Sequence, residues 1–522
     1  MQTLAIVVAM SASSSAAEPC SGQSCEAQKE VAIEAVWSHP VERTVHAPDK
    51  IVVTGEMKGT TFTPTTVTIP DPAGAEVDRG PVSFPLLENL APLFEFRTFG
   101  VEERTLVERD GDALTVRCGA GDRPAGAAFS TEGFRYPRAM RGGLVIEGET
   151  ASNFSFAVVP KGADAPDHPA ASNGSAPALA SIPASEWNDG GRDRELVVSC
   201  PVGAGTVAIS SIHIVPPLSG GPAGVGTWVW DITRWLGRPE QLLLLLRSRD
   251  ADDVFLQVSI DDGEVVDREE LSRLIAILSA GGIGVHAVEG DPDMVTQIGR
   301  VNALERARVL RHFMETTGLR SVQYDIEPYL RPDHVADPAA GWSAWAETIH
   351  ELAAALGGPV DVVVPFWILT DPAGERALQA VQDSVSGVTV MVYRTDVANV
   401  ERIAEGWLSW GVARDLPIGI ALENGPLPAE IHKTFVRAER GEVALDRSGE
   451  RHSVLPFPEP VPDSGNRPVY SFSHEVEVSP SRISFLDDKE ALARTRERLS
   501  RTLPAWESFQ GLLIHDLITT KE

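Results

Sequence analysis

The spacing of apolar residues changes near residue 217 and divides the chain into two parts. Before that point, short runs rich in Val, Ile, Thr and Phe are separated by Gly, Pro, Asp and Asn, as in KIVVTGEM, ALTVRCGA, GLVIEG and ELVVSCP. Apolar and polar positions alternate with a period of two, as they do along strands that are buried on one face. The pattern predicts an all-β sandwich, jelly-roll-like, over residues 31–217.

After residue 217, apolar strand-like runs alternate with helical stretches, which is typical of parallel βα units. The predicted strands are eight: 226–231, 253–261, 282–291, 320–329, 360–367, 387–394, 416–424 and 511–517. This number of strands predicts an α/β fold, a (β/α)₈ TIM barrel over residues 218–522. The connection between the last two strands is proline-rich and roughly 90 residues long, so we interpret it as an insertion or an extra hairpin.

The N-terminal segment, residues 1–30, is predicted to be signal-like and flexible. An apolar run over 4–10 is followed by small residues ending at Ala17, which is similar to the apolar core and cleavage site of a secretory signal, although the positive residues that usually precede it are missing. We therefore expect export, to the periplasm or outside the cell. Beyond this segment, the sequence has no apolar stretch of the roughly 18 residues that cross a membrane.

The charge balance restricts the partners. The chain has 45 Lys and Arg against 74 Asp and Glu, a formal net charge of -29, and its sequence contains no basic patch. Such a chain repels polyanions, which excludes nucleic acid and anionic membrane surfaces as partners. A neutral or cationic polysaccharide remains compatible with the charge. The oligomeric state is not indicated.

Four cysteines allow two interpretations. Cys118 and Cys200 lie in strand-like runs of the predicted sandwich, where they either form a disulfide in an exported protein or remain two separate buried thiols. Cys20 and Cys25 lie in a polar segment near the N-terminus. The spacing of Cys and His does not match that of a zinc site, and we expect no metal and no cofactor.

The ends of the predicted barrel strands carry carboxylates and aromatic residues. In a TIM barrel the active site lies at these C-terminal ends. Carboxylates supply acids, bases and nucleophiles, and flat aromatic faces stack on sugar rings, whereas neither a lysine nor a glycine-rich phosphate loop is found there. We expect a carbohydrate substrate, and the predicted substrate-binding residues are Trp230, Glu289, Trp367, Arg394 and Asp516. His515 either assists at the site or has a structural role.

The sharpest motif lies on the fourth predicted strand, Tyr324 to Tyr329. Asp325 and Glu327 are two residues apart, so both side chains point to the same face and into the barrel mouth. Two carboxyls in close contact do not readily ionise together, so one pKa rises. A protonated Glu beside an ionised Asp suits general-acid attack on a glycosidic oxygen. Alternatively, Asp325 is a buried structural carboxylate and Glu327 a rim residue.

This strand resembles the end of the Asp-x-x-Asp-x-Asp-x-Glu signature of the chitinase-like family 18 glycoside hydrolases, and Met391-Val392-Tyr393 is similar to the Met-x-Tyr of that family. The resemblance implies that Glu327 is the acid and that Asp325 orients a substrate N-acetyl group, which attacks its own anomeric carbon. Tyr393 would then support the oxazolinium. Three positions depart from the family pattern: Arg320, Gln323 and Arg394.

A second mechanism uses Glu423. The chain also resembles the large barrel clan of retaining glycosidases, in which an acid/base Glu ends strand four and a nucleophilic Glu ends strand seven. Glu327 and Glu423 occupy these strand ends, although Ile326 stands where that clan has Asn. A retaining pair needs carboxyls about 5–5.5 Å apart and an inverting pair about 6.5–9.5 Å. Alternatively, Glu423 is only a rim carboxylate.

The sequence thus predicts a glycoside hydrolase acting on a poly- or oligosaccharide, with Glu327 as general acid/base assisted by Asp325, and with Tyr393 and Glu423 as further catalytic candidates. An alternative is a non-catalytic glycan-binding protein with a degenerate barrel site. A metal-dependent hydrolase is disfavoured by the scarcity of His at the strand ends. The sandwich either binds glycan, through Trp37 or Trp187, or only packs against the barrel. The sequence indicates neither the sugar nor the linkage.

Overall fold

A computed structural model describes residues 6–7, 33–35, 50–58, 61–68, 89–130, 141–160, 178–184, 194–215, 224–331, 333–334, 337–446, 452–464 and 467–518. Most of the signal-like segment lies outside these residues, as do Cys20, Cys25, Trp37 and Trp187.

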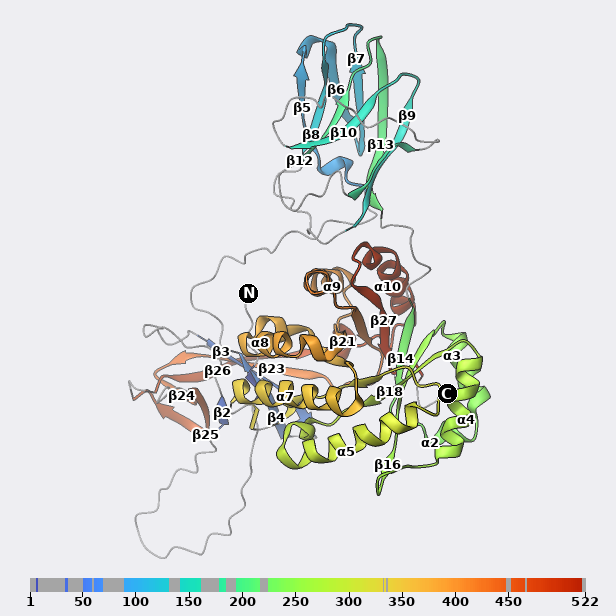
Figure 1. The fold of residues 1–522 in the computed structure, drawn as a ribbon. Helices are drawn as coiled ribbons and strands as arrows, with labels where there is room; N and C mark the ends of the chain where they lie inside the picture. The colour runs from blue at the N-terminus through green and yellow to red at the C-terminus, as the bar shows by residue number, and fades with distance from the viewer. Residues whose placement is uncertain are drawn as a thin grey trace, which may run out of the picture.

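The C-terminal part contains the predicted barrel. Eight parallel strands close on themselves in chain order (Figure 1). They are β14 (Val225–Val229), β15 (Asp253–Gln257), β18 (Gly284–Glu289), β19 (Val322–Tyr324), β20 (Val360–Pro365), β21 (Val385–Met391), β22 (Ile418–Glu423) and β27 (Phe509–His515). The fold class predicted from the eight apolar runs is confirmed. Strands buried on both faces read as continuous apolar segments, which is why these runs were visible in the sequence.

Helices of the connections surround the barrel (Figure 1). They are α2 (Thr233–Leu236), α3 (Pro239–Ser248), α4 (Arg268–Ala280), α5 (Gln297–Met314), α7 (Pro338–Leu356), α8 (Pro372–Ala380), α9 (Val397–Val412) and α10 (Lys489–Thr502). Side chains of Asp337, Asp371, Asp396 and Asp488 accept hydrogen bonds from backbone N–H groups in the first turns of their helices. These N-caps determine where each βα loop ends. None of the helices described combines the length and the hydrophobicity of a membrane span.

Side chains fill the barrel beneath its mouth. An apolar cluster occupies the interior: Trp228, Phe255, Val288, Val363, Met391, Ala421 and Leu513. The indole of Trp228 donates to Gln323 Oε1 at 2.6 Å, and Gln323 Nε2 donates to Thr389 Oγ1 at 3.1 Å. Gln323, which replaces a signature Asp, is thus a hydrogen-bonded core residue that supports the floor of the mouth.

The predicted sandwich is formed by two antiparallel sheets, with strand orders β10-β12-β8-β5 and β11-β9-β13-β7-β6. Its strands are β5 (Glu95–Gly100), β6 (Thr105–Asp110), β7 (Ala113–Cys118), β8 (Ala125–Ser130), β9 (Gly143–Thr150), β10 (Ser155–Pro160), β11 (Ala178–Ile182), β12 (Arg194–Ser199) and β13 (Gly205–Val215). Cys118 ends β7 in one sheet and Cys200 follows β12 in the other. Their sulfurs are bonded, with the Cα atoms 5.7 Å apart, so a disulfide joins the two sheets.

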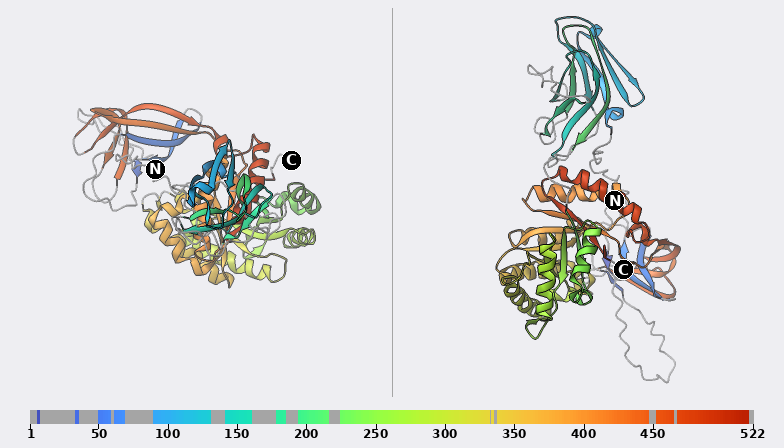
Figure 2. Two further views of the ribbon diagram at one scale, coloured as in Figure 1. Left: turned by 90° about the horizontal axis from the view of Figure 1, so that it is seen from above. Right: turned by 90° about the vertical axis from the view of Figure 1, so that its right-hand side faces the viewer.

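A third sheet combines the insertion with the N-terminal strands. The insertion supplies β23 (Glu430–Ala438), β24 (Arg440–Asp446), β25 (His452–Pro462) and β26 (Val469–Val478). Strand β3 (Lys50–Lys58) pairs antiparallel with β23 and is followed by β4 (Thr61–Thr68), while β1 (Ile6–Val7) and β2 (Ile33–Ala35) lie at the two edges. Figure 2 shows β3 and β4, in blue, beside these orange strands. Strands β3 and β4, expected within the sandwich, therefore belong to another sheet. The alternation of apolar and polar residues in β3 and β4 indicates strands but does not specify which strands they pair with.

Removing the disulfide by a Cys118→Ala, Cys200→Ala double substitution should destabilise the sandwich by about 2–5 kcal/mol, because the bond closes a loop of 82 residues. Native-state hydrogen exchange measures this separately for each domain. We expect faster exchange in β7 and β12, and unchanged exchange in the barrel strands. Reduction of the wild-type protein should give the same pattern. The prediction would be contradicted if the sandwich strands were as well protected against hydrogen exchange after the substitution as before it.

Candidate active site

The predicted carboxyl pair lies where β19 ends. Asp325 donates its backbone N–H to the carbonyl of Glu289 at 2.8 Å, which extends the ladder with β18 by one residue. Glu327 follows as the N-cap residue of the short 3₁₀ helix that starts at Pro328. Ile326, between the two, is 2% exposed and belongs to the core. The alternation expected of a strand therefore directs both carboxyls away from the core and toward the mouth.

Burial controls the ionisation of this pair. Burial, and after it the charge of Glu327, raise the pKa of Asp325 to about 8, although the charge of His515 acts in the opposite direction. Burial also raises the pKa of Glu327, against the hydrogen bond from Tyr329 and the charge of His515. Oδ1 of Asp325 is enclosed and has no hydrogen-bond partner within the described structure. The pair therefore titrates as a unit and keeps a proton at neutral pH.

The loop after β18 packs against this pair at Gly290. A Cβ atom at this position would collide with the backbone carbonyl of Asp325 and would lie 3.1 Å from its Cβ. Only a glycine allows the chain to approach so closely. Gly290 is thus part of the reason why Asp325 is enclosed.

Glu423 and His515 form a second pair at the ends of two neighbouring strands, β22 and β27. His515 Nδ1 lies 2.9 and 3.0 Å from the two carboxylate oxygens of Glu423, and the backbone N–H of Gly425 donates to the same carboxylate. Glu423 is 2% exposed. Burial lowers the pKa of His515, but the hydrogen bond and the charge of Glu423, with Asp516 and Asp325, raise it above its usual value. Glu423 is therefore engaged in orienting the imidazole.

Tyr393, which follows β21, lies close to both pairs. Burial raises the pKa of its hydroxyl well above the usual value, and the charges of Glu423, Asp325 and Glu327 raise it further. Its ring centroid is 6.5 Å from that of His515. The phenol thus stays protonated and remains a hydrogen-bond donor. The next residue, Arg394, places its guanidinium 4.8 Å from the ring centroid of Phe366.

Aromatic side chains support Glu327 on one flank. The Tyr329 hydroxyl donates to Glu327 Oε1. The Tyr329 ring contacts Trp367, with centroids 5.1 Å apart at an interplanar angle of 71°, and Trp367 in turn contacts the buried Trp342. Trp230, which follows β14, is partly buried against the apolar cluster of the barrel interior. Trp367 and Trp230 are therefore held just beyond the ends of β20 and β14, and their stacking on a sugar stays a prediction.

Two of the predicted substrate-binding residues, Glu289 and Asp516, differ from each other in their surroundings. Glu289, at the end of β18, is 3% exposed and accepts from Arg306 at 2.6 and 3.0 Å. Arg306 also donates to the carbonyls of Val258 and Ile260, so the Glu289 carboxylate is engaged inside the protein. Asp516 follows β27 with a positive φ of 51°. Burial raises its pKa, His515 lowers it and Glu423 raises it, so Asp516 shares the electrostatics of the mouth.

Tyr329 was assigned no role by the sequence analysis, although it belongs to the motif that identified Asp325 and Glu327. A signal was present, because a Tyr two residues beyond an acid lies within hydrogen-bond reach of it. Arg306 was also missed. It lies in the middle of α5, where an arginine resembles any solvated helical residue, so no sequence signal distinguishes it.

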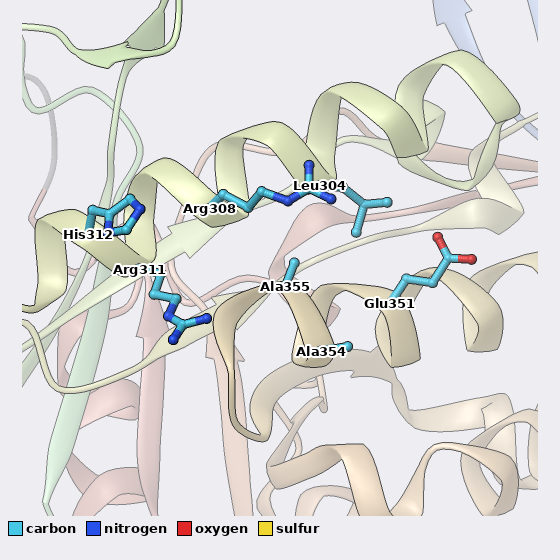
Figure 3. A pocket seen from close by; sticks show the side chains of 7 residues that line it. All are labelled: Leu304, Arg308, Arg311, His312, Glu351, Ala354 and Ala355. Atoms are coloured by element: carbon cyan, nitrogen blue, oxygen red, sulfur yellow. The ribbon is translucent and has the colours of Figure 1, made fainter.

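Other sites for a ligand are limited. Among the described residues, no three His, Cys, Asp or Glu side chains converge in a way that would hold a metal ion. A groove of 590 Å³ lies in the outer helical layer between α5 and α7. Figure 3 shows its lining, which comprises Leu304, Arg308, Arg311, His312, Glu351, Ala354 and Ala355. The groove contains none of the predicted site residues.

Comparison with known proteins gives no family assignment. No family model matches the chain, and no curated protein sequence matches it. Among solved structures, the spore cortex-lytic enzyme SleL of Bacillus cereus aligns at 10% identity with a TM-score of 0.32, covering 59% of this chain and 73% of that one.

Two further structures show a similarly distant likeness. A GH18 chitinase from Pseudoalteromonas aurantia aligns at 11% identity and a TM-score of 0.30, covering 39% of this chain and 81% of that one. A GH20 β-N-acetylhexosaminidase from Streptomyces coelicolor aligns at 10% identity with a TM-score of 0.26, covering 45% of this chain and 52% of that one. The chain thus has a distant resemblance to glycoside hydrolases. At these TM-scores the resemblance assigns no role to any residue.

The pH dependence of stability tests the ionisation of the carboxyl pair. The folded pKa of Asp325, about 8, lies above that of an unfolded Asp, so its contribution is fully present below about pH 4 and is lost as the pH rises through 8. Asparagine cannot ionise. The Asp325→Asn variant should therefore gain stability relative to wild type as the pH rises from 5 to 9, by up to about 4 kcal/mol because the slope is about 1.4 kcal/mol per pH unit up to pH 8, measured by urea denaturation.

The matched control is Asp262→Asn, at an exposed turn residue with φ of 45° that asparagine also adopts. Its difference from wild type should not change with pH. A difference for Asp325→Asn that is equally flat would show that the carboxyl is ionised in the folded protein at pH 5.

Proposed function

We propose that the barrel hydrolyses glycosidic bonds of a poly- or oligosaccharide, with Glu327 as the general acid and Asp325 as its partner. The observation that carries the proposal is the pair itself: two adjacent carboxyls that share burial and charge at the C-terminal end of β19. A carboxyl protonated near neutral pH is what proton donation to a glycosidic oxygen requires. TIM-barrel enzymes carry their catalytic groups at this end of the strands.

The surroundings of the pair favour a sugar as the substrate. Trp230 and Trp367 stand at strand ends on either side, and aromatic faces pack against sugar rings. Acidic side chains gather around them, and the whole chain carries a formal charge of -29. We infer that the substrate is neutral or cationic rather than a polyanion, because an anionic glycan would be repelled.

Glu423 is not the nucleophile in this proposal. Its two oxygens accept from His515, and one of them accepts from Gly425 as well. Attack on an anomeric carbon would require a carboxylate oxygen that the sugar can reach, and the Glu423 side chain is only 3% exposed. We assign Glu423 to the orientation of His515, and Tyr393 to hydrogen bonding at the mouth.

A non-catalytic glycan-binding protein is the second candidate. The observation that favours it concerns Gln323, which stands where the family 18 signature has Asp. Its side-chain amide is hydrogen-bonded to Trp228 and Thr389 in the core. Such a protein would keep the aromatic residues and would bind glycan without Glu327.

Export is also proposed. The disulfide between Cys118 and Cys200 supports it, because such bonds persist in oxidising compartments. Whether the sandwich binds glycan stays a prediction.

The decisive substitution is Glu327→Gln, assayed on soluble oligosaccharides of N-acetylglucosamine, xylose and mannose. Loss of the acid should lower kcat/KM by about 10²–10⁴-fold on the oligosaccharide that the wild type cleaves. A dinitrophenyl glycoside of the same sugar needs little acid help because its leaving group is a weak base, so its hydrolysis should fall far less. Glu305→Gln, at an exposed residue of α5, is the matched control and should leave both rates unchanged.

Equal cleavage by wild type and Glu327→Gln would refute the role of Glu327. A wild type that cleaves none of the oligosaccharides but binds one of them, with affinity unchanged in Glu327→Gln, would support the glycan-binding candidate instead.

A further inference from the structure

We propose that His515, oriented by Glu423, is the general base that removes a proton from the attacking water, so that cleavage inverts the anomeric configuration. The inference rests on the proposed glycosidase function and adds a catalytic residue and a stereochemical outcome to it.

The order of the barrel strands places Glu327 and His515 on opposite sides of the mouth. In the closed sequence β14-β15-β18-β19-β20-β21-β22-β27, three strands separate β19 from β27 in either direction. The ends of these two strands are therefore opposite each other across the mouth. Glu327 follows the first and His515 ends the second. A sugar bound between them would have an acid on one face and a base on the other, which is the arrangement of inverting enzymes.

The hydrogen bond to Glu423 fixes the orientation of the His515 imidazole. Nδ1 is bonded to Glu423, and Nε2 has no protein partner within the described part of the chain. The His515 side chain is 35% exposed, whereas that of Glu423 is 3% exposed, so the imidazole is reached from the mouth and the carboxylate is not. Trp228 and Tyr393 flank the ring, at centroid distances of 6.1 and 6.5 Å. A buried carboxylate that fixes the tautomer of a histidine is a recurring device for a base.

The electrostatics agree with this role. The charged and titratable groups that act on His515 are Glu423, Asp516, Asp325, Glu327 and Tyr393. Burial lowers the pKa of the imidazole, but Glu423 and the neighbouring carboxylates raise it above its usual value. The imidazole is therefore a stronger base than a free histidine.

The bond changes balance without any further reactant. The water oxygen bonds to the anomeric carbon while one of its protons passes to Nε2 of His515. The bond from that carbon to the glycosidic oxygen breaks, and this oxygen takes the proton of Glu327. Proton exchange with solvent returns both groups to their starting states. One water is consumed, and neither Glu423 nor an N-acetyl group of the substrate forms a covalent bond.

The first test is proton NMR of the fresh product from the oligosaccharide that the wild type cleaves fastest. We expect an initial anomer opposite to that of the cleaved linkage. A retained anomer would overturn the inference and leave the glycosidase proposal standing. If the wild type cleaves none of the oligosaccharides, the proposed function itself fails, so the two failures are distinguishable.

The second test is His515→Asn. The asparagine amide nitrogen takes the place of Nδ1 and keeps the donor to Glu423, but it provides no base. We expect kcat/KM to fall by about 10²–10⁴-fold on the oligosaccharide and also on the dinitrophenyl glycoside, which Glu327→Gln largely spares. The acidic limb of the pH–rate profile, which reports protonation of the base, should disappear.

Azide provides a readout that a structural role would not change. Added to His515→Asn, it should restore turnover of the dinitrophenyl glycoside and give a glycosyl azide of inverted configuration, because azide needs no base. Circular dichroism verifies the fold of the variant. Wild-type activity in His515→Asn, or no rescue by azide in a folded variant, would overturn the assignment. If the variant does not fold, the anomer released by the wild type still tests whether cleavage inverts the configuration.

Discussion

Carboxyl groups buried at the mouth of a barrel must be neutralised, and this constraint organises the site. The chain meets it in three ways at three strand ends. Glu289 is neutralised by a bidentate arginine, Arg306, and Glu423 is paired with an imidazole. Within the part of the chain that the structure describes, Asp325 and Glu327 have no cation bonded to them, and the pair retains a proton instead. The ion pair of Glu289 with Arg306 keeps its charge, whereas a protonated carboxyl can donate its proton. The carboxyl pair without a cation is therefore the one suited to chemistry.

The two ends of the barrel differ in how their polar groups are satisfied. At the N-terminal end, His286 contacts Ser321 at 2.8 Å and Asp253 at 3.1 Å, and Ser321 donates to Asp361 at 2.7 Å. These groups satisfy one another and stabilise the fold. At the C-terminal end, Oδ1 of Asp325 is enclosed and has no hydrogen-bond partner among the residues that the structure describes. An unsatisfied acceptor costs free energy in the empty protein, and a substrate donor would remove that cost. The two ends thus differ in whether every buried polar group has a partner among the described residues.

Much of the barrel was predictable because its information is local. Strands buried on both faces read as apolar runs, and the spacing of Asp325 and Glu327 gives their shared direction. Contacts between distant segments were not predictable. The pairing of β3 with β23 joins residues that are hundreds of positions apart, and nothing in an alternating strand specifies its neighbour. The partnership of Glu289 with Arg306 was missed for the same reason, since it depends on where α5 packs against the barrel.

The insertion is connected to the proposed base through the turn after β22. Where the chain returns from the third sheet, Ser484 donates to the carbonyl of Gly425 at 2.6 Å, and Phe485 donates to the carbonyl of Glu423 at 3.0 Å. A Cβ atom on Gly425 would lie 2.9 Å from the Glu423 carboxylate, so a larger residue there would displace that carboxylate. The returning chain therefore holds Glu423 from outside while His515 holds it from within the mouth. Because the orientation of the imidazole depends on that carboxylate, the position of the insertion contributes to the geometry of the site, even though its sheet lies outside the barrel.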